Sequence, residues 1–227
     1  MRRALCGACE GRATATIRPV RSPHRRSGSD EPWIERGTNV ERTVFFSDAV
    51  FAIAITLLAL EIRVPEDPRD LGEALLELWP RFISFFISFW FVGTYWVAHH
   101  RAFRYVSGYD RRLLFINLLF LMWIVLLPFS SSLLGEHGDH QVVVIIYATH
   151  IALTGLTLQW VWRYAWRDER LMDASRMDER ERRYNELGLS VPLVFLVSIG
   201  VSFVSVTAAE LFWFLAFVVR PVLHRIL

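Results

Sequence analysis

The residues that could do chemistry are few, and they lie inside or beside long apolar stretches. Asp48 falls within an apolar run at 44–62, and Arg42 precedes it by six residues. A carboxylate inside a membrane helix is costly, so by default it faces a polar partner or a water-filled path. The run is long enough to cross a bilayer core of about 30 Å, at about 1.5 Å per residue. It is therefore the first place to look for function.

A second polar group combines the adjacent His99 and His100 with Asn117. Histidines can relay protons or bind metals. Adjacent residues on a helix point about 100° apart, so one site would rarely use both histidines. A hydrogen-bonded network that positions the first helix, with Asp48 and Arg42 at similar depth, is the favoured interpretation. A proton relay and metal ligation stay open as alternatives.

The two cysteines, Cys6 and Cys9, form a lone Cys-x-x-Cys pair. A structural zinc site needs four ligands, and the sequence has no second pair. It also has no glycine loop for phosphates, no recognisable catalytic triad and no potassium-filter motif. We therefore expect no metal site, no cofactor and no enzymatic activity.

Composition and apolar blocks indicate an all-α membrane protein. The 227 residues are 53% hydrophobic and include seventeen Phe and nine Trp. Such blocks are typical of a polytopic membrane protein. Six transmembrane helices are predicted, at about 44–62, 82–98, 113–134, 142–162, 189–206 and 211–223. A short amphipathic helix is expected at 71–78, a turn at 135–140, a helical extension at 163–186, and a break of the last apolar stretch near Ala208-Ala209-Glu210.

The charges of the connecting segments predict the domain organisation and the orientation. Residues 1–36 hold eight Arg and no apolar run, so we expect a disordered cytoplasmic tail before a six-helix domain at 37–227. Arg-rich segments alternate along the chain with acidic or Arg-free ones. The positive-inside rule then places both termini in the cytoplasm.

One face of the first helix carries a stripe of residues at i, i+3, i+4 and i+7: Ile53, Thr56, Leu57 and Leu60. This spacing forms a single stripe on an α-helix. By periodicity alone, packing against other helices explains the stripe better than a pore lining does. Asp48 lies about one turn below it.

The motif around Asp48 resembles a known family. Arg42-x-x-x-Phe46-Ser47-Asp48, followed by the apolar run through Leu60-Glu61-Ile62, is similar to the signature first helix of the transmembrane-protein-175 family of potassium channels. Supporting matches are Trp96-Val-Ala-His99-His100-Arg-Ala-Phe103, Asn117-Leu-Leu-Phe-Leu and Leu127-Pro128-Phe129-Ser130. The resemblance covers about residues 40–225 and leaves the Arg-rich tail outside.

This resemblance implies a homotetramer in which the first helix of each subunit lines a central pore without a re-entrant filter. At matching positions, Ile53, Leu57 and Leu60 would form a hydrophobic constriction, and Thr56 would contribute to selectivity. With this resemblance, the pore lining becomes the favoured interpretation of the stripe.

The resemblance also implies a network that holds the first helix against its neighbours, made of Arg42, Phe46, Ser47, Asp48 and His99. Asn117 joins it by its predicted depth. Glu61, at the other end of the first helix, would attract cations to the outer mouth.

The expected function is a potassium-selective channel of the cell membrane, multi-pass and surrounded by lipid, with potassium as the permeant ion. One alternative is a proton-conducting channel in which Asp48 and His99 titrate. Another is a non-conducting scaffold or sensor subunit, and a membrane-embedded enzyme is a weaker third. No nucleic-acid partner is expected.

Overall fold

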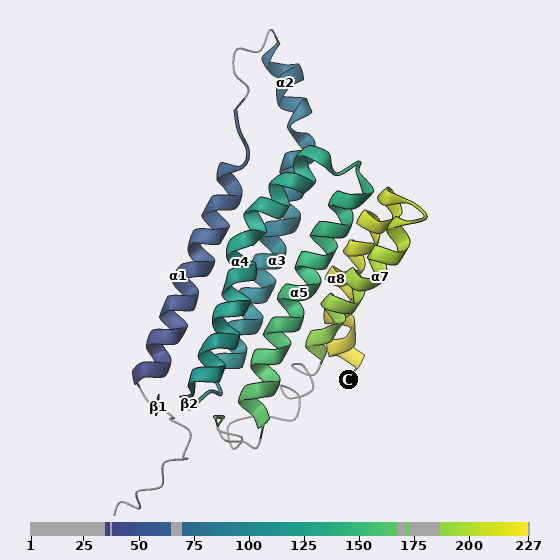
Figure 1. The fold of residues 1–227 in the computed structure, drawn as a ribbon. Coiled ribbons are helices and arrows are strands. Elements are labelled where there is room, and N and C mark those ends of the chain that lie inside the picture. The colour runs from purple at the N-terminus through teal and green to yellow at the C-terminus, as the bar shows by residue number, and fades with distance from the viewer. Residues whose placement is uncertain (1–34, 37, 65–69, 168–170, 173–186, 227) are drawn as a thin grey trace, which may run out of the picture. The chain divides into compact units, whose positions relative to one another are not determined.

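The computed structural model describes residues 35–36, 38–64, 70–167, 171–172 and 187–226, and most of these are helical (Figure 1). The long helices in chain order are α1 (Thr38–Leu60), α3 (Trp79–Phe103), α4 (Arg111–His137), α5 (Gln141–Trp166), α7 (Ser190–Ser202) and α8 (Val206–Ile226). Two short helices complete this set, namely α2 (Leu71–Glu77) and the 3-10 turn η3 (Leu187–Leu189). The Cys-x-x-Cys pair and the tail predicted to be disordered lie outside the described residues, except for Glu35–Arg36.

Glu35–Arg36 form strand β1, which pairs with strand β2 (Gly108–Tyr109) in the connection between α3 and α4. The pairing is antiparallel, with Glu35 opposite Tyr109 and Arg36 opposite Gly108. This short ladder ties the segment before α1 to the same end of the bundle as the α3–α4 connection.

The helices pack in a row that begins with α1. α1 lies against α3 and α4, α4 against α5, α5 against α7, and α7 against α8 (Figure 1). Large side chains fill the core between them; Phe51, Phe120, Tyr147, Phe195 and Trp213 are all fully buried.

Among the described residues, four helices are long and apolar enough to cross a bilayer. They span Val40–Leu60, Trp79–Phe103, Arg111–His137 and Gln141–Trp166. Two further apolar helical segments, Ser190–Ser202 and Val206–Ala216, are shorter. The thirteen residues of α7 measure about 20 Å along the axis, which is less than a bilayer core of about 30 Å. The six apolar helices expected from the sequence are present, and four of them have the length of a span.

The predicted break near Ala208-Ala209-Glu210 is wrong by about one turn. α7 ends at Ser202, and α8 begins at Val206. The Ser205 hydroxyl accepts a hydrogen bond of 3.2 Å from the backbone N–H of Ala208. A serine in this position satisfies a free N–H of the first helical turn, so the boundary falls there.

Two other helix ends also differ from the sequence prediction. α4 continues to His137, so the turn predicted to begin at Gly135 begins about three residues later. α5 continues to Trp166, and most of the helical extension predicted at 163–186 lies outside the described residues. The short helix predicted at 71–78 is confirmed as α2, which is capped by the carboxylate of Asp70.

Polar side chains cross-link α3 to its neighbours inside the apolar bundle. Ser84 bonds to Ser131 of α4, Ser88 lies 2.9 Å from the hydroxyl of Tyr147, and the Tyr95 hydroxyl donates to the carbonyl of Ile151 at 2.7 Å. Small residues and interhelical hydrogen bonds of this kind stabilise helix contacts where water is absent. These bonds fix α3 against α4 and α5. α1 in turn packs on α3 and α4.

Candidate functional site: the first helix and its polar contacts

α1 has one buried face and one exposed face. Ser47, Phe51, Ala54 and Leu58 are buried, and their spacing of four, three and four residues places them on one side of the helix. This side packs on α3 and α4. α1 is still the least buried of the four candidate spans, with 22% of its most apolar window buried, compared with 61% for α5.

The stripe singled out in the sequence lies on the exposed face. Ile53 is 59% exposed, Leu57 38% and Leu60 72%, and Thr56 is also exposed. The Thr56 hydroxyl donates to the carbonyl of Ile53 at 2.8 Å, so its oxygen lone pairs stay available on this face. In this single chain the stripe has no covering helix among the described residues. The face is therefore free for a second subunit, a pore or lipid.

A buried polar cluster joins α1 to both of its neighbours. Ser47, His99 and Asn117 are each at most 2% exposed, and they come from α1, α3 and α4. The Asn117 amide nitrogen donates to the Ser47 oxygen at 3.1 Å, and the Asn117 carbonyl lies 2.9 Å from Nε2 of His99. These two bonds link three helices through one side chain.

The hydrogen-bond directions in this cluster are consistent from one end to the other. The Ser47 hydroxyl donates to the carbonyl of Thr43 at 2.9 Å, so its oxygen accepts from Asn117. The amide oxygen of Asn117 can only accept, so His99 carries its hydrogen on Nε2. Nδ1 of His99 has no partner among the described residues. The cluster therefore suits a neutral histidine in a structural role.

Aromatic rings hold the His99 imidazole in place. The ring stacks on Phe103 at a centroid distance of 4.3 Å and on Phe120 at 5.6 Å, and Phe51 lies 5.8 Å away. His100, the next residue, is exposed. Because adjacent residues on a helix point in different directions, the side chain of His99 is buried and that of His100 is exposed. Among the described residues, no group of three or more His, Cys, Asp or Glu could hold a metal ion.

Asp48 contacts α3 separately from the buried cluster. Its carboxylate accepts a hydrogen bond of 2.9 Å from the indole nitrogen of Trp96, which is 40% exposed. The Trp96 ring in turn lies 5.7 Å from that of His100. Asp48 therefore bonds α1 to α3 at a contact separate from the buried cluster, although it directly follows the buried Ser47 in the chain.

The structure places the other predicted site residues apart from this cluster. Arg42 is exposed and forms no salt bridge among the described residues, and Phe46 is 53% exposed on the same side of α1 as Ile53. Glu61 is half-buried at the far end of α1, in a small recess that Arg81 also lines. Of the six residues predicted to form one network, three are hydrogen-bonded together, and Asp48 is bonded to a different residue of α3.

Sequence reasoning missed a second buried histidine, His150 of α5. Its Nε2 donates to the carbonyl of Trp123 at 2.8 Å, and its Nδ1 lies 2.7 Å from the hydroxyl of Ser130. His150 thereby joins α5 to α4 near Pro128. Because a proline has no backbone N–H, α4 lacks one backbone hydrogen bond at this position. A single histidine inside an apolar span was the available signal.

The comparisons with known proteins agree with this arrangement of helices. A family model described as the endosomal/lysosomal potassium channel TMEM175 matches residues 42–128, from α1 into α4. A potassium channel of Streptomyces collinus is 36% identical over 171 residues, which are 72% of this chain and 82% of the relative. The chain belongs to the TMEM175 family. Its members are ion channels, which excludes an enzyme.

Other TMEM175 relatives are similar over different shares of the chain. A potassium channel of Chamaesiphon minutus is 36% identical over 71% of this chain and 83% of its own length. The human endosomal/lysosomal proton channel TMEM175 is 41% identical, over 55% of this chain and 28% of its own length. Both a potassium and a proton activity are thus named among the relatives.

The TMEM175 fold is also found among solved structures. The crystal structure of a lysosomal potassium-selective channel TMEM175 homologue from Chamaesiphon minutus superposes with a TM-score of 0.73 at 30% identity, over 83% of this chain and 99% of that one. The matched region of the family model contains the α1 stripe, Asp48 and the buried cluster. The region that matches the family model thus includes the helix whose face is exposed here.

Proposed function

We propose that this chain is one subunit of a homotetrameric potassium channel in which four copies of α1 line the pore. The exposed α1 stripe is the observation that supports this proposal most. A lipid-facing stripe would need only apolar side chains, but this one carries the hydroxyl of Thr56 beside the small Ala49 and Ala52. Four helices that meet around an axis need small residues and available oxygens on the facing side.

The hydrophobic residues of the stripe would form the constriction. Four copies of Ile53 at one level make a narrow apolar ring, which closes a pore by excluding water. Leu57 and Leu60 would narrow the same pore one and two turns further out. An ion passes only when these rings widen enough to keep it partly hydrated, so selectivity for potassium over sodium would be modest. Thr56 oxygens would supply partial coordination.

The buried cluster and the Trp96–Asp48 bond would set the angle of α1. Both contacts lie near one end of α1, while the stripe extends toward the other. We propose that they hold this end of the pore helix against α3 and α4, so that opening moves the far end. Arg42 and Phe46, which are exposed in one chain, would then contact a neighbouring subunit, and Glu61 would lie at the outer mouth.

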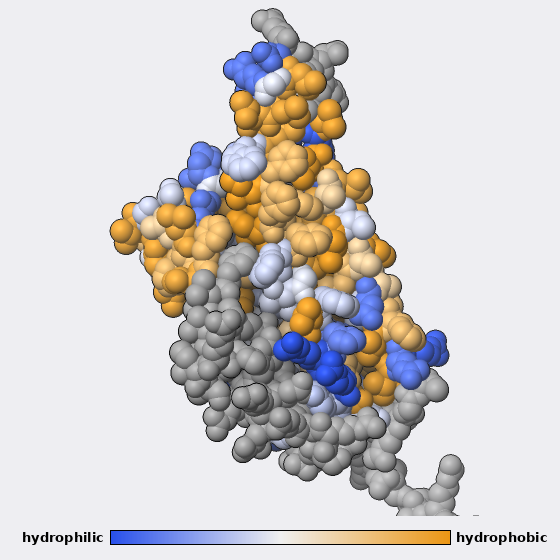
Figure 2. Space-filling view, turned by 180° about the vertical axis from the view of Figure 1, so that it is seen from behind, coloured by the Kyte–Doolittle hydropathy of each residue, from blue (hydrophilic) through white to orange (hydrophobic). Residues whose placement is uncertain are grey.

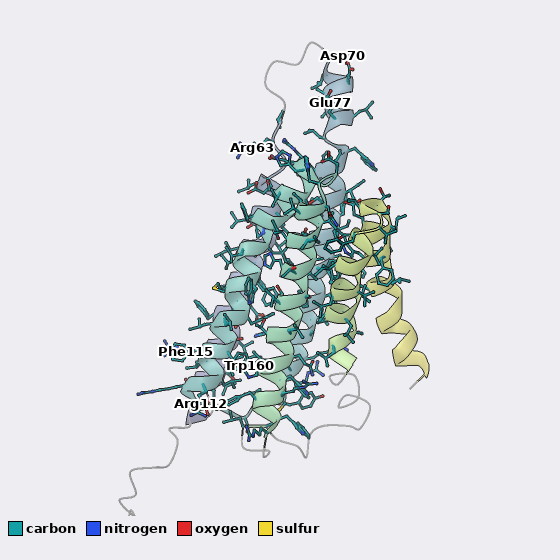
Figure 3. All side chains as sticks on the ribbon, turned by 45° about the vertical axis from the view of Figure 1, so that its right-hand side comes forward. Arg63, Asp70, Glu77, Arg112, Phe115 and Trp160 are labelled. Carbon is teal, nitrogen blue, oxygen red and sulfur yellow. The ribbon has the colours of Figure 1, made fainter. Side chains whose placement is uncertain are left out.

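The proposed topology has six crossings with both termini in the cytoplasm of a cell membrane. Figure 3 shows Asp70 and Glu77 at one end of the bundle and Arg112 at the other. The Arg-rich connection that follows α3 thus lies at the proposed cytoplasmic end, in agreement with the positive-inside rule. Arg63 also lies at the outer end, near α2 (Figure 3). α7, which is shorter than a bilayer core, would cross together with α8 through local thinning of the bilayer.

A flux assay on purified protein in liposomes tests this proposal. Native protein should pass potassium faster than sodium, and Ile53→Asn should raise both rates and reduce the preference. Leu193→Asn is the matched control, because Leu193 on α7 is 56% exposed, close to the 59% of Ile53. Flux that is unchanged by Ile53→Asn in an intact tetramer would contradict the pore lining.

Proton conduction is the second candidate, favoured by the proton-channel names of the animal relatives. In that case a pH gradient alone should drive current through the native protein with potassium absent. The absence of any flux from an intact tetramer would instead favour a scaffold or sensor subunit.

A further inference from the structure

A large cavity lies at the outer end of the bundle, away from the exposed stripe of α1. It measures about 650 Å³ and is bounded by the first turns of α3, the last turns of α4 and the first turns of α8. Cavities of about 300–1,000 Å³ are the usual size for small organic ligands. Figure 2 shows the molecule from behind the view of Figure 1. On this face, apolar side chains cover the end of the bundle that carries α2.

Three side chains of α8 that line this cavity fall on one helical face. Glu210, Trp213 and Phe214 are spaced at i, i+3 and i+4, so they lie side by side. Trp213 is fully buried, and its indole N–H donates to Ser198 at 2.9 Å, which fixes the ring. Phe214 is 52% exposed at the open side. The face combines a carboxylate with one buried and one half-exposed aromatic ring.

Glu210 is the charge that this cavity offers to a ligand. Among the described residues it forms no hydrogen bond or salt bridge, although it is half-buried one turn into an apolar helix. The other two acids of the lining differ from it. Glu136 is already paired with Arg81 at 3.3 Å, and the side chain of Asp139 is 81% exposed. Among the described residues no basic side chain lines the cavity, so this lining favours cations and disfavours anions.

The Glu210 carboxylate lies close to the C-terminal end of α4. Oε1 of Glu210 lies 3.5 Å from the place where a Cβ on Gly138 would be. The same cavity is lined by the aliphatic side chains of Ile83 and Ile87 from α3, so the carboxylate and an apolar surface share one cavity.

From these contacts we infer that the cavity binds an amphiphilic organic cation, with its ammonium group at Glu210 and its aromatic or alkyl body between α3 and α8. The apolar walls would take the body, the carboxylate would pair with the ammonium, and the exposed ring of Phe214 would add cation–π attraction. Such a ligand would bridge α8 to α3 and α4. This inference does not depend on the proposed pore, because no residue of α1 lines the cavity.

Binding to the purified full-length protein in detergent tests the inference, with phenylbutylamine as the probe and phenylbutanol as its uncharged counterpart. The amine should bind tighter than the alcohol and raise the unfolding temperature progressively as its concentration increases above its Kd. Glu210→Gln should weaken the amine about tenfold and leave the alcohol unchanged. The matched control is Glu73→Gln, an exposed acid on α2 at the same end of the bundle but outside the cavity.

A second variant tests the contribution of the cavity without changing the Glu210 carboxylate. Thr207 lines the cavity and is exposed, so Thr207→Phe should narrow the cavity and weaken the binding of both probes while the fold is kept. Equal binding of amine and alcohol to the native protein would overturn the inference, and so would an amine affinity that Glu210→Gln does not change. The absence of amine binding to the native protein would also overturn it.

Discussion

Replacing Asn117 by alanine should destabilise the protein more than any other single change in the buried cluster. Asn117 makes both bonds that join α1, α3 and α4, and it is 2% exposed. Interhelical hydrogen bonds in membranes contribute about 0.6 kcal/mol on average and up to about 1.7. The N–H of His99 would also stay buried without an acceptor, at a cost of about 1–3 kcal/mol. The expected loss in free energy of unfolding is about 2–3 kcal/mol.

A double-mutant cycle isolates the bond to α1 from the rest of this loss. Ser47→Ala, Asn117→Ala and the double variant would be unfolded with denaturant in detergent micelles and followed by helical circular dichroism. The coupling energy between Ser47 and Asn117 should be about 0.5–1.5 kcal/mol. Thr56→Ala is the control, because its hydroxyl bonds only its own helix, and it should change stability by less than about 0.5 kcal/mol. A coupling energy near zero would refute the role of the cluster.

Three further predictions concern helix packing, the second contact of α1 and ion selectivity. Gly155→Ala should destabilise by about 1–3 kcal/mol in the same unfolding assay, because its Cβ would lie 2.5 Å from a proline ring of α7; Gly93→Ala, with nothing within 4 Å, should not. Asp48→Ala and Trp96→Phe should lower the fraction of tetramer in size-exclusion chromatography equally, and unequal losses would refute their shared bond. Thr56→Val, which removes only the hydroxyl, should lower the potassium-to-sodium flux ratio; an unchanged ratio would remove this oxygen from the pore.

The apolar runs of the sequence were sufficient to predict the helices, because length and hydropathy decide where a span can form. The apolar runs did not predict the position of the break between α7 and α8, because no change in hydropathy marks it. The boundary depends on the hydroxyl of Ser205, which bonds the backbone of Ala208, and this local contact prevails over the Ala-Ala-Glu sequence that follows. Short polar caps inside an apolar stretch are easily overlooked for this reason.

The sequence predicted the depth of the polar site residues along their helices, but it did not predict their hydrogen-bond partners. Topology placed Asp48, His99 and Asn117 near the same end of their helices. The structure joins His99 and Asn117 by a hydrogen bond, and their partner on α1 is Ser47, which only the family resemblance had assigned to the network. The partner of Asp48 depends on which side of α3 carries an indole, and Trp96 was assigned no role from the sequence. Periodicity identified the α1 stripe as one face, but it does not distinguish lipid from a pore.

Thiol accessibility during flux is the measurement that tests the central claim most directly. In a Cys6→Ser/Cys9→Ser background, the variant Ile53→Cys would be exposed to a small cationic thiol reagent while potassium flux is recorded in liposomes. If four copies of α1 line the pore, modification should block the flux, and a high potassium concentration should slow the modification. Leu193→Cys should be modified without block. Full modification at position 53 with undiminished flux would contradict the account.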